Sequence, residues 1–138
     1  MTRGQRLKPV QQRLDEAERS LATALATTRR KRAEADAKLA ELQRYEADYH
    51  ESFKRQAATG LGSVALRDYR VFLGRLAEAV RQQQLIVLRA GEEEQAATRD
   101  WQDAARRARG LTAVVARWDG EARRALERRE QRDTDERA

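Results

Sequence analysis

Several residue types that build enzyme sites are scarce or missing in this chain. It has no cysteine, which excludes disulfides, thiolate metal sites and cysteine nucleophiles. Its one histidine, His50, has no second histidine or cysteine with which to share a metal, so we expect an ordinary helix-surface side chain. No glycine-rich phosphate loop of an ATPase and no arrangement typical of a catalytic triad is present. We therefore expect no enzymatic activity, no metal and no cofactor.

Long apolar segments are also missing. The longest strictly aliphatic run is Leu-Ile-Val-Leu at residues 85–88, whereas a membrane helix needs roughly 20 apolar residues. The first residues, MTRGQRLKPV, contain no apolar segment of the kind found in signal peptides. These two absences predict a soluble, cytoplasmic protein.

Large apolar side chains are few, and charged ones are abundant. Charged residues make up 38% of the chain and hydrophobic ones 40%, but 25 of the hydrophobic residues are alanine. The remainder is too small for a compact core at this length. A chain rich in Ala, Glu, Arg, Leu and Gln with one proline is typical of a long helix or coiled coil, and disorder is the alternative.

The periodicity of the second half decides against disorder. Alternating steps of three and four residues from Leu66 reach apolar positions for more than eight heptads, interrupted only by Gln83 and Glu94. The stripe comprises Leu66, Tyr69, Leu73, Leu76, Val80, Gln83, Val87, Ala90, Glu94, Ala97, Trp101, Ala104, Ala108, Leu111, Val115, Trp118, Ala122 and Ala125. Glu94 is a candidate for specifying register, and the two tryptophans for packing along the seam.

The first half carries a looser stripe, weakened at Thr28 and Arg32, and two glycines, Gly60 and Gly62, separate the halves. A short connection makes antiparallel neighbours. The prediction is therefore an all-α fold, one long two-helix antiparallel coiled-coil hairpin over residues 1–138. Its parts are expected as helix one at about 6–58, a turn at about 59–63, helix two at about 64–130, and a frayed C-terminal tail. Residues facing each other across the seam should have numbers that add to about 121.

All tyrosines and phenylalanines lie between Tyr45 and Phe72, on both sides of this turn. The predicted register pairs Tyr49 with Phe72 and Tyr45 with Leu76. Two helices cannot bury all these rings between them, since Phe72 and its neighbour Leu73 cannot both point inward. An exposed apolar patch that binds a protein is one interpretation. The other is that the rings thicken and hold the turn.

The net charge of +6 is unevenly distributed. The surplus of basic residues lies near the two chain ends, and the middle is slightly acidic. Such ends suit nucleic acid, an anionic membrane or an acidic protein surface, although a solvated helix face would carry similar charges.

Three segments in order resemble the FliJ family of flagellar export proteins. They are ELQRYEADYHESF before the turn, LRDYRVFLGRLAEAVRQQQ after it, and the closing EQRDTDERA. The resemblance implies a non-enzymatic stalk of the flagellar type III export apparatus, similar to the central stalk of rotary ATPases. It implies that the free ends insert into the hexameric ring of the export ATPase FliI, with further binding to the gate protein FlhA and to export chaperones. The expected location is the cytoplasm, peripherally associated with the inner membrane at the flagellar base.

The resemblance also implies a gate-binding patch on both helices near the turn. The residues that match its pattern are Lys38, Leu42, Tyr45, Tyr49, Phe72, Leu76, Ala79 and Gln83. Lys38 departs from the usual Gln or His. Three alternatives stay open: the equivalent stalk of a virulence secretion system, a basic scaffold that binds nucleic acid or membrane, and a generic coiled-coil homodimer. The stalk hypothesis predicts no nucleic-acid binding and a monomer when the protein is isolated.

Overall fold

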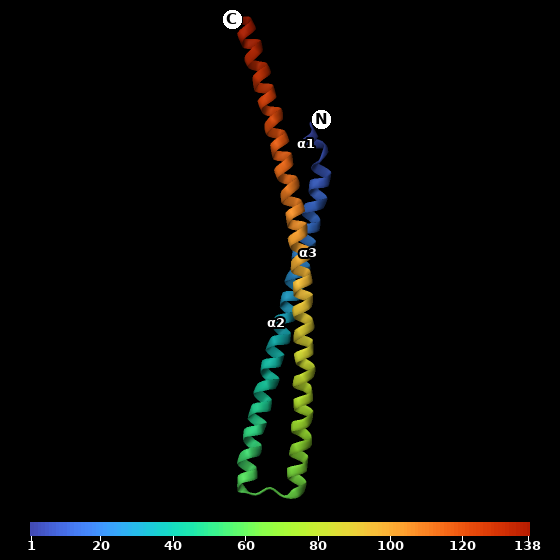
Figure 1. Ribbon diagram of the computed structural model, residues 1–138, viewed down its shortest axis with the longest axis vertical. Coiled ribbons are helices and arrows are strands. Elements are labelled where there is room, and N and C mark those ends of the chain that lie inside the picture. Colours follow the sequence, from blue (N-terminus) through green and yellow to red (C-terminus); the bar gives the residue numbers. More distant parts are fainter. The chain divides into compact units, whose positions relative to one another are not determined.

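The computed structural model describes residues 1–138 and consists of three helices without strands. A single turn, α1, covers Arg3–Arg6, and the two long helices are α2 at Lys8–Thr59 and α3 at Ser63–Arg137. The long helices are joined at residues 60–62 and pack against each other as a hairpin, which confirms the predicted all-α fold (Figure 1). α3 extends beyond the predicted end near residue 130. No helix combines the length and the apolar character needed to cross a membrane.

The single turn α1 is separated from α2 by a break that Pro9 explains. A capping box stands at the N-terminus of α1. In it, the Thr2 hydroxyl accepts a hydrogen bond from the backbone N–H of Gln5, and the Gln5 side chain accepts one from the backbone N–H of Thr2. Proline at position 9 has no N–H to donate to the carbonyl of Gln5, and its ring clashes with that carbonyl in a continuous helix. The chain therefore breaks at Leu7 and starts again as α2 at Lys8.

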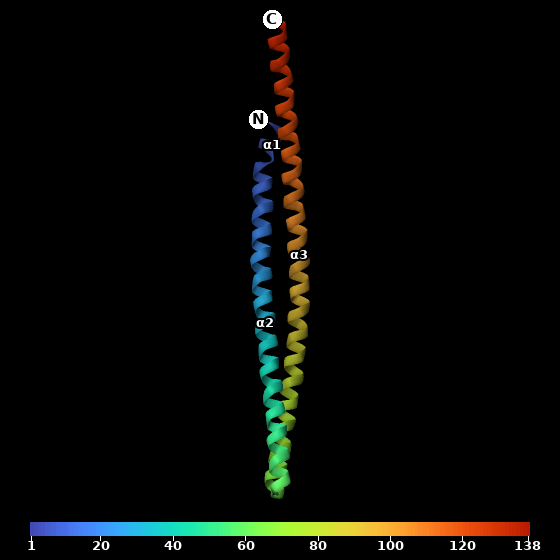
Figure 2. The ribbon, with the colours of Figure 1, turned by 90° about the vertical axis from the view of Figure 1, so that its left-hand side faces the viewer.

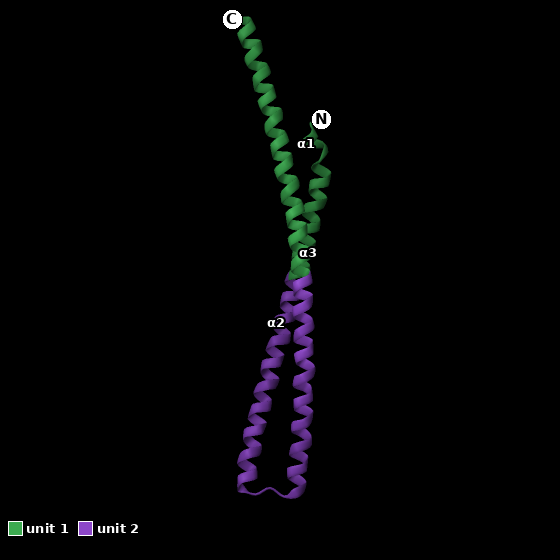
Figure 3. Cartoon of the chain, in the orientation of Figure 1, with its two compact units in different colours: residues 1–25, 97–138 green, residues 26–96 purple.

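The hairpin divides into two compact units, shown in Figure 3. Unit 1 holds residues 1–25 and 97–138, and unit 2 holds residues 26–96 with the turn. The two arms of unit 2 lie side by side on the way to the turn, as Figure 1 and the rotated view in Figure 2 both show. The buried apolar residues of unit 1 are Leu25, Ala104, Ala105, Ala108 and Val115. Those of unit 2 are Ala35, Leu73, Val80 and Ala90.

Alanine forms more than half of this buried set, and no large side chain in the chain is completely buried. Two helices leave one side of every seam residue near solvent, so the core is a narrow strip. Within each unit, the contacts between the two arms follow the predicted register. In unit 1, the Gln11 amide donates to the Thr112 hydroxyl at 3.1 Å. In unit 2, the rings of Tyr49 and Phe72 meet with centroids 4.7 Å apart.

Gly60 provides the backbone conformation that ends α2. Its φ is +96°, in the left-handed region that glycine adopts without strain, and its N–H donates to the Ala57 carbonyl at 3.3 Å. We expect Gly60→Ala to lower the free energy of unfolding by about 1 kcal/mol, because a Cβ is strained at this φ. Thermal unfolding followed by circular dichroism measures the effect.

Gly62→Ala is the matched control, since Gly62 lies in the same turn with a negative φ. A Cβ at either glycine would meet nothing within 4 Å, so steric crowding does not separate the two variants. Gly62→Ala should leave stability unchanged or raise it slightly by restricting the unfolded chain. Equal losses of stability in both variants would contradict the role assigned to the φ of Gly60.

Candidate partner-binding site

The eight residues expected to form a partner-binding patch all belong to unit 2. α2 carries one half of the set and α3 the other half, in the antiparallel order that the register requires. The α2 members are Lys38, Leu42, Tyr45 and Tyr49, and the α3 members are Phe72, Leu76, Ala79 and Gln83. The patch is therefore assembled only when the two arms pair.

Three aromatic rings run in sequence across the two helices. Tyr45 and Tyr49 are one helical turn apart on α2, with centroids separated by 6.4 Å and planes inclined by 26°. Tyr49 then meets Phe72 of α3 at 4.7 Å with an interplanar angle of 56°. Such offset and tilted arrangements are favourable for aromatic pairs. The rings thus support one another in fixed positions.

These rings remain substantially exposed to solvent. The exposed fractions are 52% for Tyr45, 37% for Tyr49 and 42% for Phe72. An ordered group of exposed aromatic side chains is the composition found at the centre of protein interfaces. Preorganised rings also lose little side-chain entropy when a partner covers them. The arrangement therefore suits protein binding.

The other members of the predicted set differ in exposure. Leu42, Leu76 and Ala79 are half-buried and connect the rings to the hairpin seam, while Lys38 is exposed. Gln83 is the exception, because only 5% of it is exposed and its side-chain amide donates to the Ala35 carbonyl at 3.0 Å. In this structure Gln83 joins the two arms and presents almost no surface to a partner.

A second aromatic pair lies nearer the turn and has a different setting. Phe53 and Tyr69 are both half-buried, with centroids 5.6 Å apart, and the Tyr69 hydroxyl lies 3.5 Å from the Ser52 hydroxyl. This pair fits the interpretation that aromatics hold the turn. The two interpretations drawn from the sequence therefore apply to different rings: the three exposed rings suit a partner, and Phe53 and Tyr69 suit the turn.

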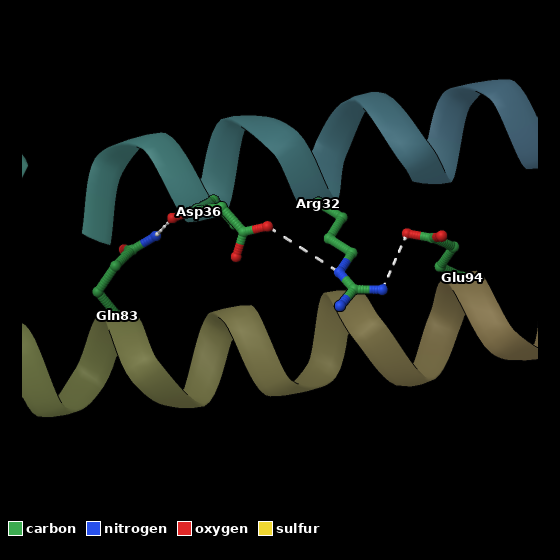
Figure 4. Close-up of polar contacts among 5 residues, drawn as sticks. Arg32, Asp36, Gln83 and Glu94 are labelled. Atoms are coloured by element: carbon green, nitrogen blue, oxygen red, sulfur yellow. Dashed lines mark hydrogen bonds and ion pairs between the residues drawn. The ribbon is translucent and has the colours of Figure 1, made fainter. Parts of the chain in front are cut away.

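Polar residues inside the seam of unit 2 meet one another across it. Arg32 of α2 extends towards α3, where its guanidinium lies 3.3 Å from the Glu94 carboxylate, and its Nε lies 4.0 Å from Asp36 (Figure 4). Gln83 and its bond to the second arm appear in the same view. The weak position of the first stripe, Arg32, thus pairs with an interruption of the second, Glu94.

The two tryptophans lie in unit 1, both half-buried along the seam. The Trp101 indole N–H donates to the Glu18 carboxylate at 2.8 Å, and the Arg3 guanidinium lies 4.7 Å above the Trp118 ring. Gly4 lies so close to Asp119 that a Cβ at position 4 would overlap the carboxylate. These contacts fix the pairing of the arms near the N-terminus, and none of them resembles a catalytic arrangement.

Exposed aliphatic residues on α3 were not part of the predicted set. Ile86 is 48% exposed, and its neighbours Leu85 and Leu88 are 56% and 60% exposed. In the sequence, the run at residues 85–88 is too short for a membrane helix, and only Val87 of it falls on the apolar stripe. Phe72, Ala79 and Ile86 follow one another at heptad spacing, and this spacing identifies Ile86 as a continuation of the patch.

No group of His, Cys, Asp or Glu side chains could hold a metal ion, and His50 is exposed on α2. The aromatic patch, by contrast, has a composition and an exposure that suit the binding of a protein.

Comparison with known proteins gives one result that covers the chain. A family model described as "Flagellar FliJ protein" matches residues 3–138. No curated protein and no solved structure matches. The matched region includes both arms of the hairpin, the turn and the whole aromatic patch. The chain therefore belongs to the FliJ family, the non-catalytic coiled-coil proteins associated with flagellar protein export.

Proposed function

We propose that this protein is the stalk that couples the export ATPase FliI to the export gate protein FlhA in the flagellar apparatus. The aromatic patch on unit 2 binds the gate, and the free ends in unit 1 enter the ATPase ring. The observation that carries the proposal is the ordered and exposed row of Tyr45, Tyr49 and Phe72, because packing within the hairpin leaves much of these rings uncovered.

Gate binding rests on residues of the patch that a partner can reach. The three rings provide the apolar centre, and the exposed Lys38 provides a positive charge at its edge. Gln83 contributes to the same function by holding α3 against α2 through Ala35. The gate would therefore recognise the paired arms and bind separated helices weakly.

Insertion into the ATPase ring rests on the open end of the hairpin. Residues 121–138 are all exposed, and α3 continues through them to Arg137. The basic surplus of the chain ends favours an acidic ring interior at short range, because salt screens such attraction beyond about 10 Å. Escort of export chaperones is a third role of the same proposal, and inner-membrane association follows from gate binding.

The decisive experiment measures both activities with the full-length chain. Addition of the protein to FliI is expected to promote ring formation and to raise ATP turnover severalfold, measured as phosphate release. Titration into the cytoplasmic domain of FlhA, followed by calorimetry, is expected to show saturable binding. Absence of both effects would contradict the proposal. Binding to DNA or anionic vesicles that weakens steeply with salt, in place of these effects, would favour a basic scaffold.

A further inference from the structure

Ile86 is only about half covered by the hairpin. It is 48% exposed, while the seam residues on the preceding turns, Val80 and Gln83, are 6% and 5% exposed. The uncovered half of its side chain is apolar surface that only a partner could remove from water. Its side chain is therefore available to a partner.

The helical repeat places Ile86 on the flank of α3 that carries the patch. Phe72, Ala79 and Ile86 are successive members of one heptad row, so they follow one another along the same side of the helix. Leu85 and Leu88 occupy the outer face of α3, away from this row. Of the three exposed aliphatics, only Ile86 extends the surface that begins at Phe72.

The opposite arm contributes a charge at the same level. The pairing of Tyr49 with Phe72 sets the register, which brings Lys38 of α2 level with the stretch between Ala79 and Ile86. Lys38 is exposed and forms no ion pair within the chain. The aliphatic side chain of Ile86 on α3 and the unpaired ammonium of Lys38 on α2 therefore lie farther from the turn than the three rings do.

Gln83 does not provide the contact expected at this end of the patch, because it is buried and bonded to Ala35. We propose that Ile86 is a further gate-binding residue and forms, with Lys38, the end of the patch that lies away from the turn. The partner surface that fits this end has an apolar pocket for Ile86 and a carboxylate opposite Lys38. This inference rests on the proposed gate-binding function and extends its surface by one heptad.

The test compares Ile86→Glu with Leu85→Glu in titrations of the full-length chain against the cytoplasmic domain of FlhA. Both variants replace an exposed aliphatic side chain with glutamate in the same helical turn, so they change net charge equally. Ile86→Glu is expected to weaken binding about tenfold or more, and Leu85→Glu less than about twofold. Circular dichroism should show the same helicity and melting temperature for both variants.

A second substitution separates contact from charge repulsion. Ile86→Ala is expected to weaken binding about threefold to tenfold without adding charge, and Ile86→Leu to retain most of the affinity. The inference is overturned if Ile86→Glu binds like the unmodified chain, or if Leu85→Glu weakens binding as much as Ile86→Glu does. Loss of affinity in Phe72→Ala with normal binding by Ile86→Glu would reject the extension and keep the proposed function. Absence of gate binding by the unmodified chain would reject the proposed function itself.

Discussion

Replacing Tyr49 and Phe72 together with alanine is expected to weaken binding to the gate by at least about 100-fold. These rings contact each other at 4.7 Å across the two arms and are 37% and 42% exposed, so the proposed partner would cover preordered apolar surface. Aromatic residues in the centre of an interface are typical hot spots, and truncation of two of them removes most of the apolar contact. Calorimetric titration of the variant against the cytoplasmic domain of FlhA measures the loss.

The second aromatic pair offers a control of matched chemistry. Phe53→Ala combined with Tyr69→Ala also removes two rings that meet across the arms, at 5.6 Å, but this pair is half-buried and nearer the turn. That variant should melt at a lower temperature and still bind the gate within about threefold of the normal affinity. If it loses binding as severely as the Tyr49 and Phe72 variant, gate binding depends on hairpin stability and the aromatic patch is not the contact surface.

Introducing a charge into the narrow core should unpair the arms of unit 2. Val80 is 6% exposed in the seam, and Val80→Asp would bury a carboxylate with no cation assigned to it. We expect a loss of about 3 kcal/mol or more from the free energy of unfolding, because a buried unpaired charge is among the costliest substitutions. For a chain of 138 residues, this corresponds to a fall in melting temperature of about 10 °C.

Val71→Asp makes the same chemical change on the same helix at a position that is 50% exposed. Its effect on stability should stay within about 0.5 kcal/mol. Thermal melts followed by circular dichroism compare the two variants directly, and Val80→Asp should also lose gate binding because the patch requires both arms. A melting temperature for Val80→Asp equal to that of Val71→Asp would show that the seam of unit 2 does not hold the arms together.

Periodicity was sufficient to predict the two long helices and their register. An apolar stripe runs along α3 through the buried Leu73, Val80 and Ala90. Each helix must cover the stripe of the other, so a glycine-containing turn between them leads to an antiparallel pair with these residues in the seam. The contact between Tyr49 and Phe72 follows from that register. The break at Leu7 was missed because its cause, Pro9, is also compatible with an ordinary helix start.

The polar partners and the exposure of each patch residue were not predictable in the same way. The stripes marked Gln83 as polar without indicating that its amide reaches the Ala35 carbonyl. Likewise, Arg32 stands in the sequence only as a weak position of the first stripe, and its ion pair with Glu94 depends on how a long side chain crosses the seam. Periodicity specifies which face a residue occupies, whereas these contacts depend on side-chain length, rotamer and the room left by neighbouring alanines.

The pairing of Tyr49 with Phe72 has a consequence for how such hairpins can change in length. Tyr49 precedes the turn glycine Gly60 on one arm, and Phe72 follows it on the other. A single residue inserted between the turn and one of these rings would rotate the rest of that arm by about 100° about its helix axis. The rings would separate, and Arg32 would turn away from Glu94. Insertions and deletions are therefore compatible with this surface only as whole heptads, made in both arms together.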